Sequence, residues 1–436
     1  MEQVPKVATC RAERRDFRGW QAVRLHNGLI DIVAVPDIGG RILAFNMGSY
    51  AYLWMDERLS GKLFSPQENQ GDGTLGTWKN YGGSKTWPAP QGRENDEQWH
   101  GPPDPILDSG RYALEHLGVV GQAATVRMRS PEDPRTGMQI TRQMTLYPGG
   151  THATLHLEMK NVSERARTWS IWDVVQLDTA KVDAAGAATH NDQAWLYVPT
   201  RRDSCFPRGY NVMFGPEDNP EWKVDVRPDL LGVQYQYRVG KIGIDSMAGW
   251  LAFVDQIQDY AFCQRFAYFA GQPYPDRGAS VECWTTGLGQ VILGMDYAKE
   301  RLYHLEAEIL GPLRRMEPGE TQSFDVEWYA ARCPGPIVNV TPAGCCHEWL
   351  RGTPVDGGTR MQGTFGVFHA GEAQLVWIDA SGRELIAETI APADPATVLR
   401  LDAVRRAPAG TSAVVLRVVE ASGKVVGPLD CWASPV

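Results

Sequence analysis

Three titratable side chains alternate with apolar ones in the segment from Tyr303 to Ile309. Successive side chains of a strand point to opposite faces, so His304, Glu306 and Glu308 would share one face. Two carboxylates on one face repel each other, which raises the pKa of one of them and can supply an acid and a base near neutral pH. A metal ion or a cationic ligand would also relieve the repulsion. A solvated strand face with a surface ion pair is the alternative interpretation.

A second candidate region is the segment 57–106, which is rich in Gly, Pro and aromatic residues. A long loop of this composition in a compact protein is usually functional. Lys85 lies there between glycines and Trp87, where an ammonium group can bind sugar hydroxyls or a carboxylate. Indole faces stack on pyranose rings, so Trp78, Trp87 and Trp99 are candidates for the same binding surface. A surface lysine and structural tryptophans are the alternative.

Charged residues inside apolar, strand-like runs add two more candidates. Glu282 precedes Trp284 by two residues and shares its strand face, where the carboxylate either reaches a ligand or forms a local pair. Arg265 lies in an apolar strand, so we expect it to bind a carboxylate partner or a ligand. The tryptophans of such runs, Trp250, Trp284 and Trp328, are expected in the core.

A β-sheet framework is predicted to position these residues. Between Ala153 and Lys160 apolar and polar residues alternate strictly, which indicates a strand with one face in the core. The apolar run 29–35, a Gly-containing turn and a return run at 41–45 predict a hairpin. Further strands are expected at 139–147, 168–178, 250–254, 260–269, 280–285, 290–296, 301–310 and 322–331.

Almost no segment before residue 332 has a helical period, which disfavours a parallel α/β sheet. The chain has 436 residues with 45 Gly and 29 Pro, which is typical of several domains joined by many turns. We therefore predict an all-β protein with a large antiparallel β-sandwich at residues 1–332. A Cys-Pro-Gly-Pro stretch at 333–336 marks the boundary, and hairpin signals predict a small immunoglobulin-like or fibronectin-like β-sandwich at 337–436.

Composition and motifs disfavour several function classes. A net charge of -9 argues against nucleic acid or an anionic membrane as a partner, because both require a basic surface. No run of 18 or more apolar residues could form a spanning helix. The sequence has no GxSxG elbow, HExxH helix, phosphate loop or dinucleotide fingerprint, so serine hydrolase, zinc protease and nucleotide-driven chemistry are poorly supported.

The cysteines and the first residues bear on cellular location. Eight cysteines lack CxxC spacing and several lie in apolar runs, so we predict buried free thiols, which fit the cytoplasm. The first 15 residues are polar and charged, unlike a signal peptide. A cytoplasmic location is expected, and a secreted or periplasmic one would follow if a leader had been removed.

Several motifs resemble known families. The Glu-bearing strand near 304–310, the Pro-Gly-Glu turn at 318–320 and a last strand ending at Trp328 resemble the closing section of aldose 1-epimerase-like proteins, in the galactose mutarotase-like superfamily. The Gly-Gly-Arg-Ile stretch at 39–42 is similar to the opening of that fold. The segments 81–91 and 274–284 resemble a bacterial family of unknown function in the same superfamily. This resemblance covers about residues 20–330.

The resemblance implies roles for individual residues. A glutamate on the penultimate strand takes the proton of the anomeric hydroxyl in that superfamily, so Glu306 or Glu308 would be the base. The family's general acid is a histidine in a central strand, but the corresponding stretch here, 172–176, has none. Asp173 or Gln176 would face the sugar there, and His190 or His100 would supply the acid from loops.

The sequence predicts a carbohydrate-active enzyme that moves protons on a mono- or oligosaccharide. The reaction would be mutarotase-like or glycan-cleaving, either as a glycoside hydrolase or as a polysaccharide lyase. Tyr81, His100 and Lys85 would move the proton in a lyase. A glycan-binding protein without turnover is the alternative from another class. No cofactor is expected to be required, and Ca²⁺ is the candidate if a metal ion lies beside the carboxylates.

Overall fold

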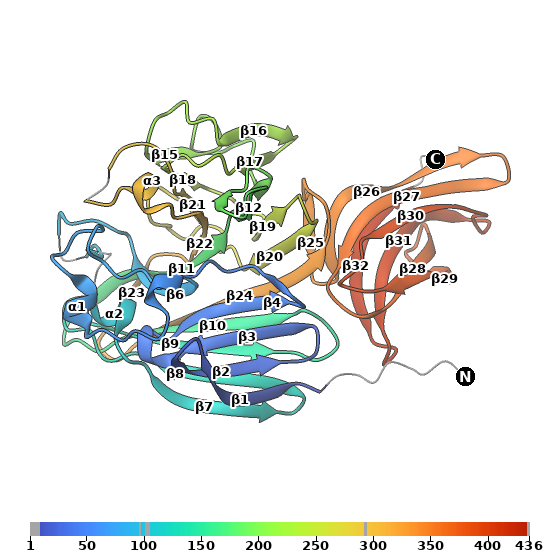
Figure 1. Cartoon of the computed structure of the whole chain (residues 1–436). Coiled ribbons are helices and arrows are strands. Elements are labelled where there is room, and N and C mark those ends of the chain that lie inside the picture. The colour runs from blue at the N-terminus through green and yellow to red at the C-terminus, as the bar shows by residue number, and fades with distance from the viewer. Residues whose placement is uncertain (1–8, 96, 101–104, 292–293, 434–436) are drawn as a thin grey trace.

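The computed structural model describes residues 9–95, 97–100, 105–291 and 294–433. Two large antiparallel sheets pack face to face to form the main body, and two smaller sheets lie at one end of it (Figure 1). The predicted all-β class with a large antiparallel sandwich is confirmed. In the described ranges, no helix has the length and apolar character needed to cross a membrane.

The first sheet of the main body brings together segments that are far apart in the sequence. Its strands lie in the order β1 (Arg11–Phe17), β2 (Trp20–His26), β3 (Ile30–Val35), β4 (Arg41–Met47), β6 (Ser84–Ala89), β11 (Arg167–Asp178), β22 (His304–Leu310), β21 (Val281–Thr285), β18 (Gly240–Ile244) and β15 (Asn211–Phe214). Two short strands are added at its margins, β5 (Tyr50–Ala51) beside β4 and β23 (Arg314–Met316) beside β11.

The second sheet covers one face of the first. Its strands lie in the order β16 (Trp222–Arg227), β17 (Leu230–Gln234), β14 (Ala194–Pro199), β19 (Trp250–Asp255), β20 (Tyr260–Phe266), β24 (Thr321–Arg332), β10 (Ala153–Asn161), β9 (Met138–Leu146), β8 (Ala123–Arg129) and β7 (Ala113–Val120). A separate hairpin consists of β12 (Ala180–Val182) and β13 (Ala188–His190).

The core between these sheets follows from the period-two pattern of the strands. Ala153, Leu155, Leu157 and Met159 of β10 are each 0% exposed, whereas the intervening residues lie on the other face. On β24, Phe324 lies opposite Leu157 and contributes to the same core. The alternation predicted for 153–160 is therefore confirmed, and burial of the apolar face is what pairs this strand with the rest of the sandwich.

Strand β6 departs from the prediction of a continuous loop over 57–106. Residues Ser84–Ala89 form a fully buried strand between β4 and β11 in the middle of the first sheet. Pro88 is tolerated because β6 pairs with β4 only at Ser84, so the missing N–H of the proline breaks no ladder on that side. Lys85 therefore projects from a rigid strand and not from a loop.

Helices are short in the described part of the chain. They are α1 (Pro66–Gln70), α2 (Pro105–Ser109) and α3 (Tyr297–Glu300), with 3-10 turns at Pro36–Ile38 and Glu57–Leu59. The strand predicted at 290–296 is not formed by the described residues of that range, and residues 292–293 lie outside them. Helix α1 contacts α2, which in turn contacts the middle strand β6, and Tyr297 of α3 packs on Trp284 and His304 of the middle strands β21 and β22.

The C-terminal residues form two four-stranded sheets around a core of their own. One contains β25 (Asn339–Thr341), β26 (Gly344–Val355), β27 (Gly358–Val367) and β30 (Leu399–Arg405); the other contains β29 (Glu384–Ala393), β28 (Gly371–Asp379), β31 (Thr411–Glu420) and β32 (Val425–Ala433). We call this part the accessory sandwich. Its residues Cys345 and Phe368 pack against Cys263 and Tyr329 on the outer face of the second sheet.

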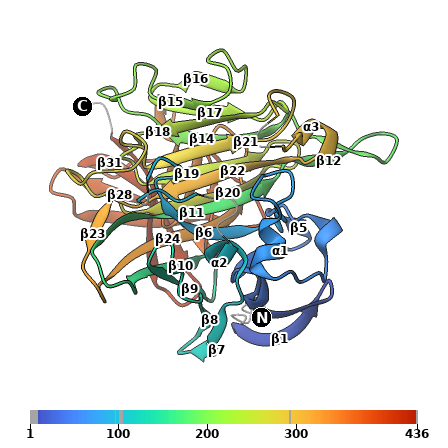
Figure 2. The ribbon, with the colours of Figure 1, turned by 90° about the vertical axis from the view of Figure 1, so that its left-hand side faces the viewer.

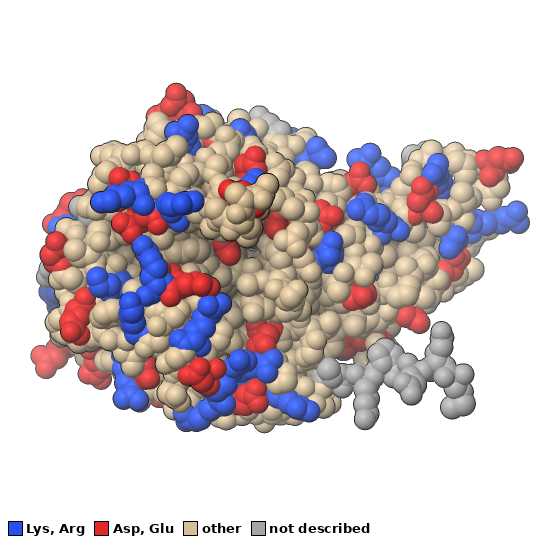
Figure 3. Space-filling view, in the orientation of Figure 1, with Lys and Arg blue, Asp and Glu red and all other residues tan. Residues whose placement is uncertain are grey.

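Charges of both signs are interspersed on the surface. On the face seen in Figure 3, Lys and Arg side chains lie among Asp and Glu side chains and form no continuous basic surface. Arg201, Arg208 and Arg315 each form an ion pair with a nearby carboxylate. The pattern is consistent with the net charge of -9 and gives no support to a long polyanion as a partner of this face.

Candidate functional site

Strand β22 presents its acidic side chains on the outer face of the first sheet. Residues 305, 307 and 309 are 0% exposed in the core between the two sheets. His304, Glu306 and Glu308 point the opposite way, as the period of two predicts. The alternative of a solvated strand face is wrong, because His304 and Glu308 are buried and only Glu306 keeps a partly exposed side chain.

Neighbouring strands add further polar and aromatic side chains to this face. Residues directly opposite each other in an antiparallel pair project to the same side. Gln176 of β11 and Trp284 of β21 flank Glu306 in this way. We call the resulting group the Glu306 site, and β11, β22 and β21 lie side by side at its base (Figure 2). The site consists of Lys85, Gln176, Lys241, Glu282, Trp284, His304, Glu306 and Glu308.

Glu306 is held by two donors. Its Oε1 accepts a hydrogen bond from Nε2 of Gln176 at 2.6 Å and lies 3.2 Å from Nζ of Lys85. Burial raises the pKa of the Glu306 carboxyl, but the charges of Lys85 and its other neighbours outweigh this effect and lower the pKa overall. The side chain is 13% exposed, so an ionised carboxylate reaches the surface of the site.

Lys85 is enclosed by aromatic rings. Its Nζ lies 4.3 Å from the ring centre of Trp87 and 5.1 Å from that of Trp78, and its side chain is 2% exposed. Burial lowers the pKa of the lysine against the opposing charge of Glu306. The two indoles are fixed in turn by Asp108, whose carboxylate accepts their N–H groups at 2.8 and 3.1 Å. Asp108 thereby positions the rings around Lys85.

A second carboxylate pair surrounds Lys241. Its Nζ lies 2.6 Å from Glu282 and 3.0 Å from Glu308, which are 1% and 0% exposed. Burial raises the pKa of Glu282 to about 7 and that of Glu308 to about 8, with Lys241 opposing both shifts. Glu282 also shares a hydrogen bond with Asp276, whose pKa is raised by burial as well. The carboxyls of Glu282 and Glu308 are therefore protonated in part of the molecules near neutral pH.

Positive charge at the carboxylates is supplied by lysine. Among the described residues, no group of three or more His, Cys, Asp or Glu side chains is arranged to hold a metal ion. A cation was expected beside Glu306 and Glu308; Lys85 lies next to Glu306, and Lys241 lies between Glu308 and Glu282. Ca²⁺ beside the carboxylates stays a prediction.

His304 is buried at the end of the site. Its ring stacks on Trp54 with 4.2 Å between ring centres, and its Nε2 lies 3.2 Å from Nε2 of Gln176. Burial lowers the pKa of His304 to about 3, which keeps the ring neutral at physiological pH. A neutral Nε2 accepts the amide N–H, so His304 orients Gln176 and, through it, Glu306.

Several residues predicted at the site lie elsewhere. Tyr81 packs edge to face on Trp20 in a separate apolar cluster, because the left-handed glycine at 82 turns the chain before β6. Arg265 shares the outer face of the second sheet with Cys263, on the opposite side of the sandwich. Asp173 points into the core between the sheets. It is three positions from Gln176, and side chains an odd number of positions apart in a strand project to opposite faces.

The two loop histidines are not brought to Glu306 by any contact that the structure shows. His190 ends strand β13 and stacks on Tyr237 at 5.5 Å, and burial lowers its pKa. His100 is half-buried next to Trp99, which is fully buried and packs on Trp87 at 4.3 Å. Trp99 therefore supports the site from within and does not offer an open ring face.

Trp284 and Lys241 differ from what the sequence suggested. Trp284 was expected in the core, but it is half-buried on the outer face, where its ring stacks on Phe214 at 5.7 Å. Lys241 was missed, although a lysine inside the apolar run 240–244 is the same signal that drew attention to Arg265. Asp108 gave no local signal, because its role depends on indoles 21 and 30 residues away.

Solved structures with a similar fold share little sequence with this chain. A galactose mutarotase-like protein from Clostridium acetobutylicum is 9% identical, with a TM-score of 0.45 over 74% of this chain and 99% of that chain. A galactose mutarotase-like protein from Lactobacillus casei is 11% identical, with a TM-score of 0.44 over 71% and 99%. The Slr1438 protein from Synechocystis is 12% identical, with a TM-score of 0.43 over 76% and 100%.

Two of these neighbours are galactose mutarotase-like by name, as the sequence resemblance predicted. No curated protein sequence matches the chain. Residues 20–331 match the family described as a domain of unknown function, DUF4380. This range includes every residue of the Glu306 site and both segments that carried the resemblance to a family of unknown function. The chain belongs to the DUF4380 family.

Proposed function

We propose that the Glu306 site binds a saccharide and that Glu306 acts as a general base on a sugar hydroxyl. The observation that supports this most directly is the lowered pKa of a carboxylate that still reaches the surface, 13% exposed, between an ammonium and an amide. Such a group is ionised at neutral pH and is positioned to accept a proton. The half-buried ring of Trp284, opposite Glu306, supplies a surface on which a pyranose can stack.

Buried polar atoms on the same face also favour a hydroxyl-rich ligand. Oε1 of Gln176, Oε1 of Glu308 and Nδ1 of His304 have no hydrogen-bond partner among the described residues. Unsatisfied buried polar atoms cost free energy, and most are paired in native proteins. A bound sugar offers many donors and acceptors, so a saccharide fits this environment better than an apolar ligand.

The reaction that best fits the site is proton transfer at an anomeric centre. Glu306 would take the proton of the anomeric hydroxyl while the bond from the anomeric carbon to the ring oxygen breaks and the ring oxygen takes up a proton. We assign that second proton to the Glu282 and Asp276 pair, which shares a hydrogen bond and has raised pKa values. Asp276 is the half-buried member of the pair. Ring closure on the other face of the anomeric carbon reverses both proton transfers. Two carboxyls whose environments give them different pKa values are typical of an acid and a base that act as a pair.

Histidine is not the acid in this scheme. The pKa of His304 is lowered to about 3 by burial, so at neutral pH the ring is not in the imidazolium form that acts as a general acid. A lyase receives less support, because Tyr81 lies in another cluster than Lys85. Glycan hydrolysis requires two carboxyls that reach the glycosidic bond, whereas the carboxyl of Glu308 is 0% exposed and accepts a hydrogen bond from Trp172.

The test is the rate of exchange between sugar anomers, measured by NMR over a panel of aldoses and uronic acids. The wild type should accelerate exchange of at least one sugar, and Glu306→Gln should lower that rate by about 10²-fold or more. Glu317→Gln is the matched control, because Glu317 is 58% exposed in a surface ion pair with Arg315. Full activity in Glu306→Gln would contradict the base assignment. Sugar binding with no exchange by the wild type would leave a non-catalytic glycan-binding protein.

A further inference from the structure

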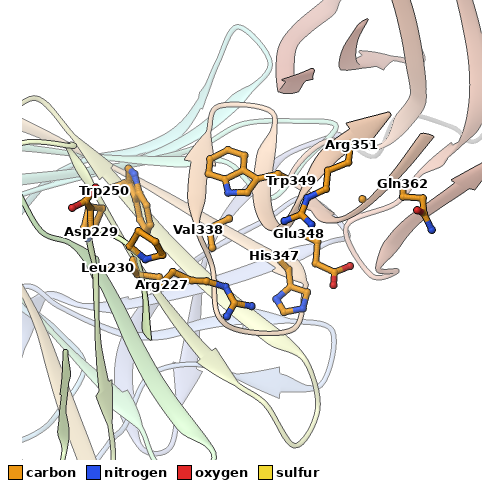
Figure 4. Close-up of a pocket in the computed structure, with 13 residues that line it drawn as sticks. Arg227, Asp229, Leu230, Trp250, Val338, His347, Glu348, Trp349, Arg351 and Gln362 are labelled. Carbon is orange, nitrogen blue, oxygen red and sulfur yellow. The ribbon is translucent and has the colours of Figure 1, made fainter. Parts of the chain in front are cut away.

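A cleft lies between the main body and the accessory sandwich, on the opposite side of the main body from the Glu306 site. It has a volume of about 640 Å³. One wall comes from the strand ends near Arg227, Leu230 and Trp250, and the other comes from β26 and β27 of the accessory sandwich (Figure 4). Volumes of this size and positions between domains are typical of ligand sites.

Two guanidinium groups in the cleft have no hydrogen-bond or ion-pair partner among the residues that the structure describes. Arg227 and Arg351 extend from the two walls toward the space between them (Figure 4). Neither side chain forms a hydrogen bond or an ion pair with any other residue that the structure describes. By contrast, Arg202 at the rim pairs with Asp229, and Arg360 on the accessory sandwich pairs with Asp402 at 2.6 Å.

The carboxylates of the cleft are already engaged. Asp229 lies 3.3 Å from Arg202, and Glu348 accepts a hydrogen bond from the hydroxyl of Thr364 at 2.8 Å. Because Arg202 pairs with Asp229, the guanidinium groups of Arg227 and Arg351 outnumber the one remaining carboxylate, Glu348, and the cleft has a net positive charge. Guanidinium groups bind carboxylates and sulfates through two parallel hydrogen bonds, so the cleft is suited to an anionic ligand.

An aromatic surface accompanies the two arginines. Trp349 lies beside Arg351 on the accessory wall and is 42% exposed, which is unusual for so large an apolar side chain. Exposed indoles next to polar groups are typical of recognition surfaces, and they stack on sugar rings. Gln362 adds an exposed amide that can donate to and accept from hydroxyls.

We propose that this cleft binds an acidic oligosaccharide, with Arg227 and Arg351 on its carboxylate or sulfate groups and Trp349 against a sugar ring. The ligand bridges the main body and the accessory sandwich. A nucleic acid fits less well, because the chain has a net charge of -9 and the face seen in Figure 3 has no continuous basic surface. The proposal stands on residues outside the Glu306 site and does not depend on catalysis there.

The test is calorimetric binding of short uronate oligomers and sulfated oligosaccharides to the full chain. Methyl-esterified uronate oligomers, which lack the charge, are the matched ligands. The acidic forms should bind at least about tenfold more tightly than the esters, and Arg227→Gln and Arg351→Gln should each weaken binding by about tenfold or more. Arg360→Gln, which alters a surface pair on the same accessory sandwich, should bind like the wild type.

Two further measurements separate this site from the Glu306 site and from misfolding. Glu306→Gln should bind the acidic oligomers as the wild type does, and every arginine variant should keep the wild-type thermal unfolding curve. Equal affinity for the acidic oligomers and their methyl esters would overturn the proposal. Wild-type affinity for the acidic oligomers in both arginine variants would do the same. So would the failure of every acidic oligomer, including the case in which a phosphopeptide or an oligonucleotide binds instead.

Discussion

Replacing Lys241 by methionine tests the electrostatic account of the Glu306 site. Met has similar length but no charge, so the change removes one ammonium from between two carboxyls that are at most 1% exposed. Breaking a buried ion pair by removing one partner typically costs about 3–5 kcal/mol, because the remaining charge is left uncompensated. Here the two carboxyls can take up protons instead of staying charged, so with pKa values of about 7 and 8 we expect Lys241→Met to lower the free energy of unfolding of the main body by a smaller amount, about 1–2 kcal/mol at pH 8.

The pKa values of the two carboxyls predict how the cost of the substitution changes with pH. Burial holds the pKa of Glu282 at about 7 and that of Glu308 at about 8, whereas an unfolded glutamate titrates near about 4.3. Between these values the folded chain binds more protons than the unfolded chain, so these two groups make stability fall as the pH rises. Without Lys241 both pKa values rise further. The cost of the substitution should therefore be large at pH 8 and small near pH 5, where both carboxyls are protonated and neutral.

The assay is urea unfolding at a series of pH values, followed by circular dichroism and fluorescence. Lys181→Met is the matched control, because Lys181 forms an exposed ion pair with Asp192 at 2.7 Å; it should change stability by no more than about 1 kcal/mol. The double variant Lys241→Met with Glu308→Gln should recover part of the loss, since the unpaired carboxyl is gone.

A loss of unfolding free energy that is very small, or that does not change with pH, would refute the reasoning. If Lys241→Met unfolds within about 0.5 kcal/mol of the wild type at pH 8, the ammonium does not compensate the buried carboxyls. The same holds if the cost of the substitution does not change between pH 5 and pH 8. A loss in the double variant equal to the sum of the two single losses would show that Lys241 and Glu308 are not coupled.

Three other outcomes follow from the structure. The rate of anomeric exchange should decrease at pH values below the ordinary titration range of a carboxyl, where Glu306, with its lowered pKa, gains a proton. It should also decrease above about pH 7, where Glu282 loses a proton. A measured pH profile that lacks these two decreases would contradict the assigned roles. Asp108→Ala should destabilise the chain by about 3–5 kcal/mol in urea unfolding, because it strips a buried guanidinium and two indoles of their acceptor. Gly82→Ala should lower the melting temperature more than Gly121→Ala does, since both have positive φ but only the Cβ at position 82 would lie 2.4 Å from a backbone oxygen.

Local alternation determined the orientation of the acidic side chains. The period of two at 304–310 placed His304, Glu306 and Glu308 on one face, and the structure shows that arrangement. The same rule placed the apolar face of 153–160 in the core. These predictions succeed because the alternation of a strand depends only on backbone geometry within a few residues, and burial of the apolar face leaves one orientation.

The phase of one strand and the start of another explain why some predicted site residues lie away from Glu306. Asp173 and Gln176 were both considered for the sugar side, but they are three positions apart, an odd number, so they project to opposite faces of β11. Tyr81 and Lys85 were taken as neighbours in one loop. A strand begins between them at Ser84, and they lie in different clusters. Sequence composition did not show where that strand begins.

The partners of the acidic residues were decided by the tertiary structure alone. Lys85 and Glu306 are 221 residues apart, Lys241 and Glu308 are 67 apart, and each pair meets only because β6, β11, β22, β21 and β18 are adjacent in that order. The pKa values follow from the same neighbours, since burial and nearby charge depend on which strands pair. The sequence thus determined which face each side chain takes, because that is local. The order of the strands in the sheet and the loops that pack over it determined which residues each side chain contacts. Both depend on contacts across the whole chain.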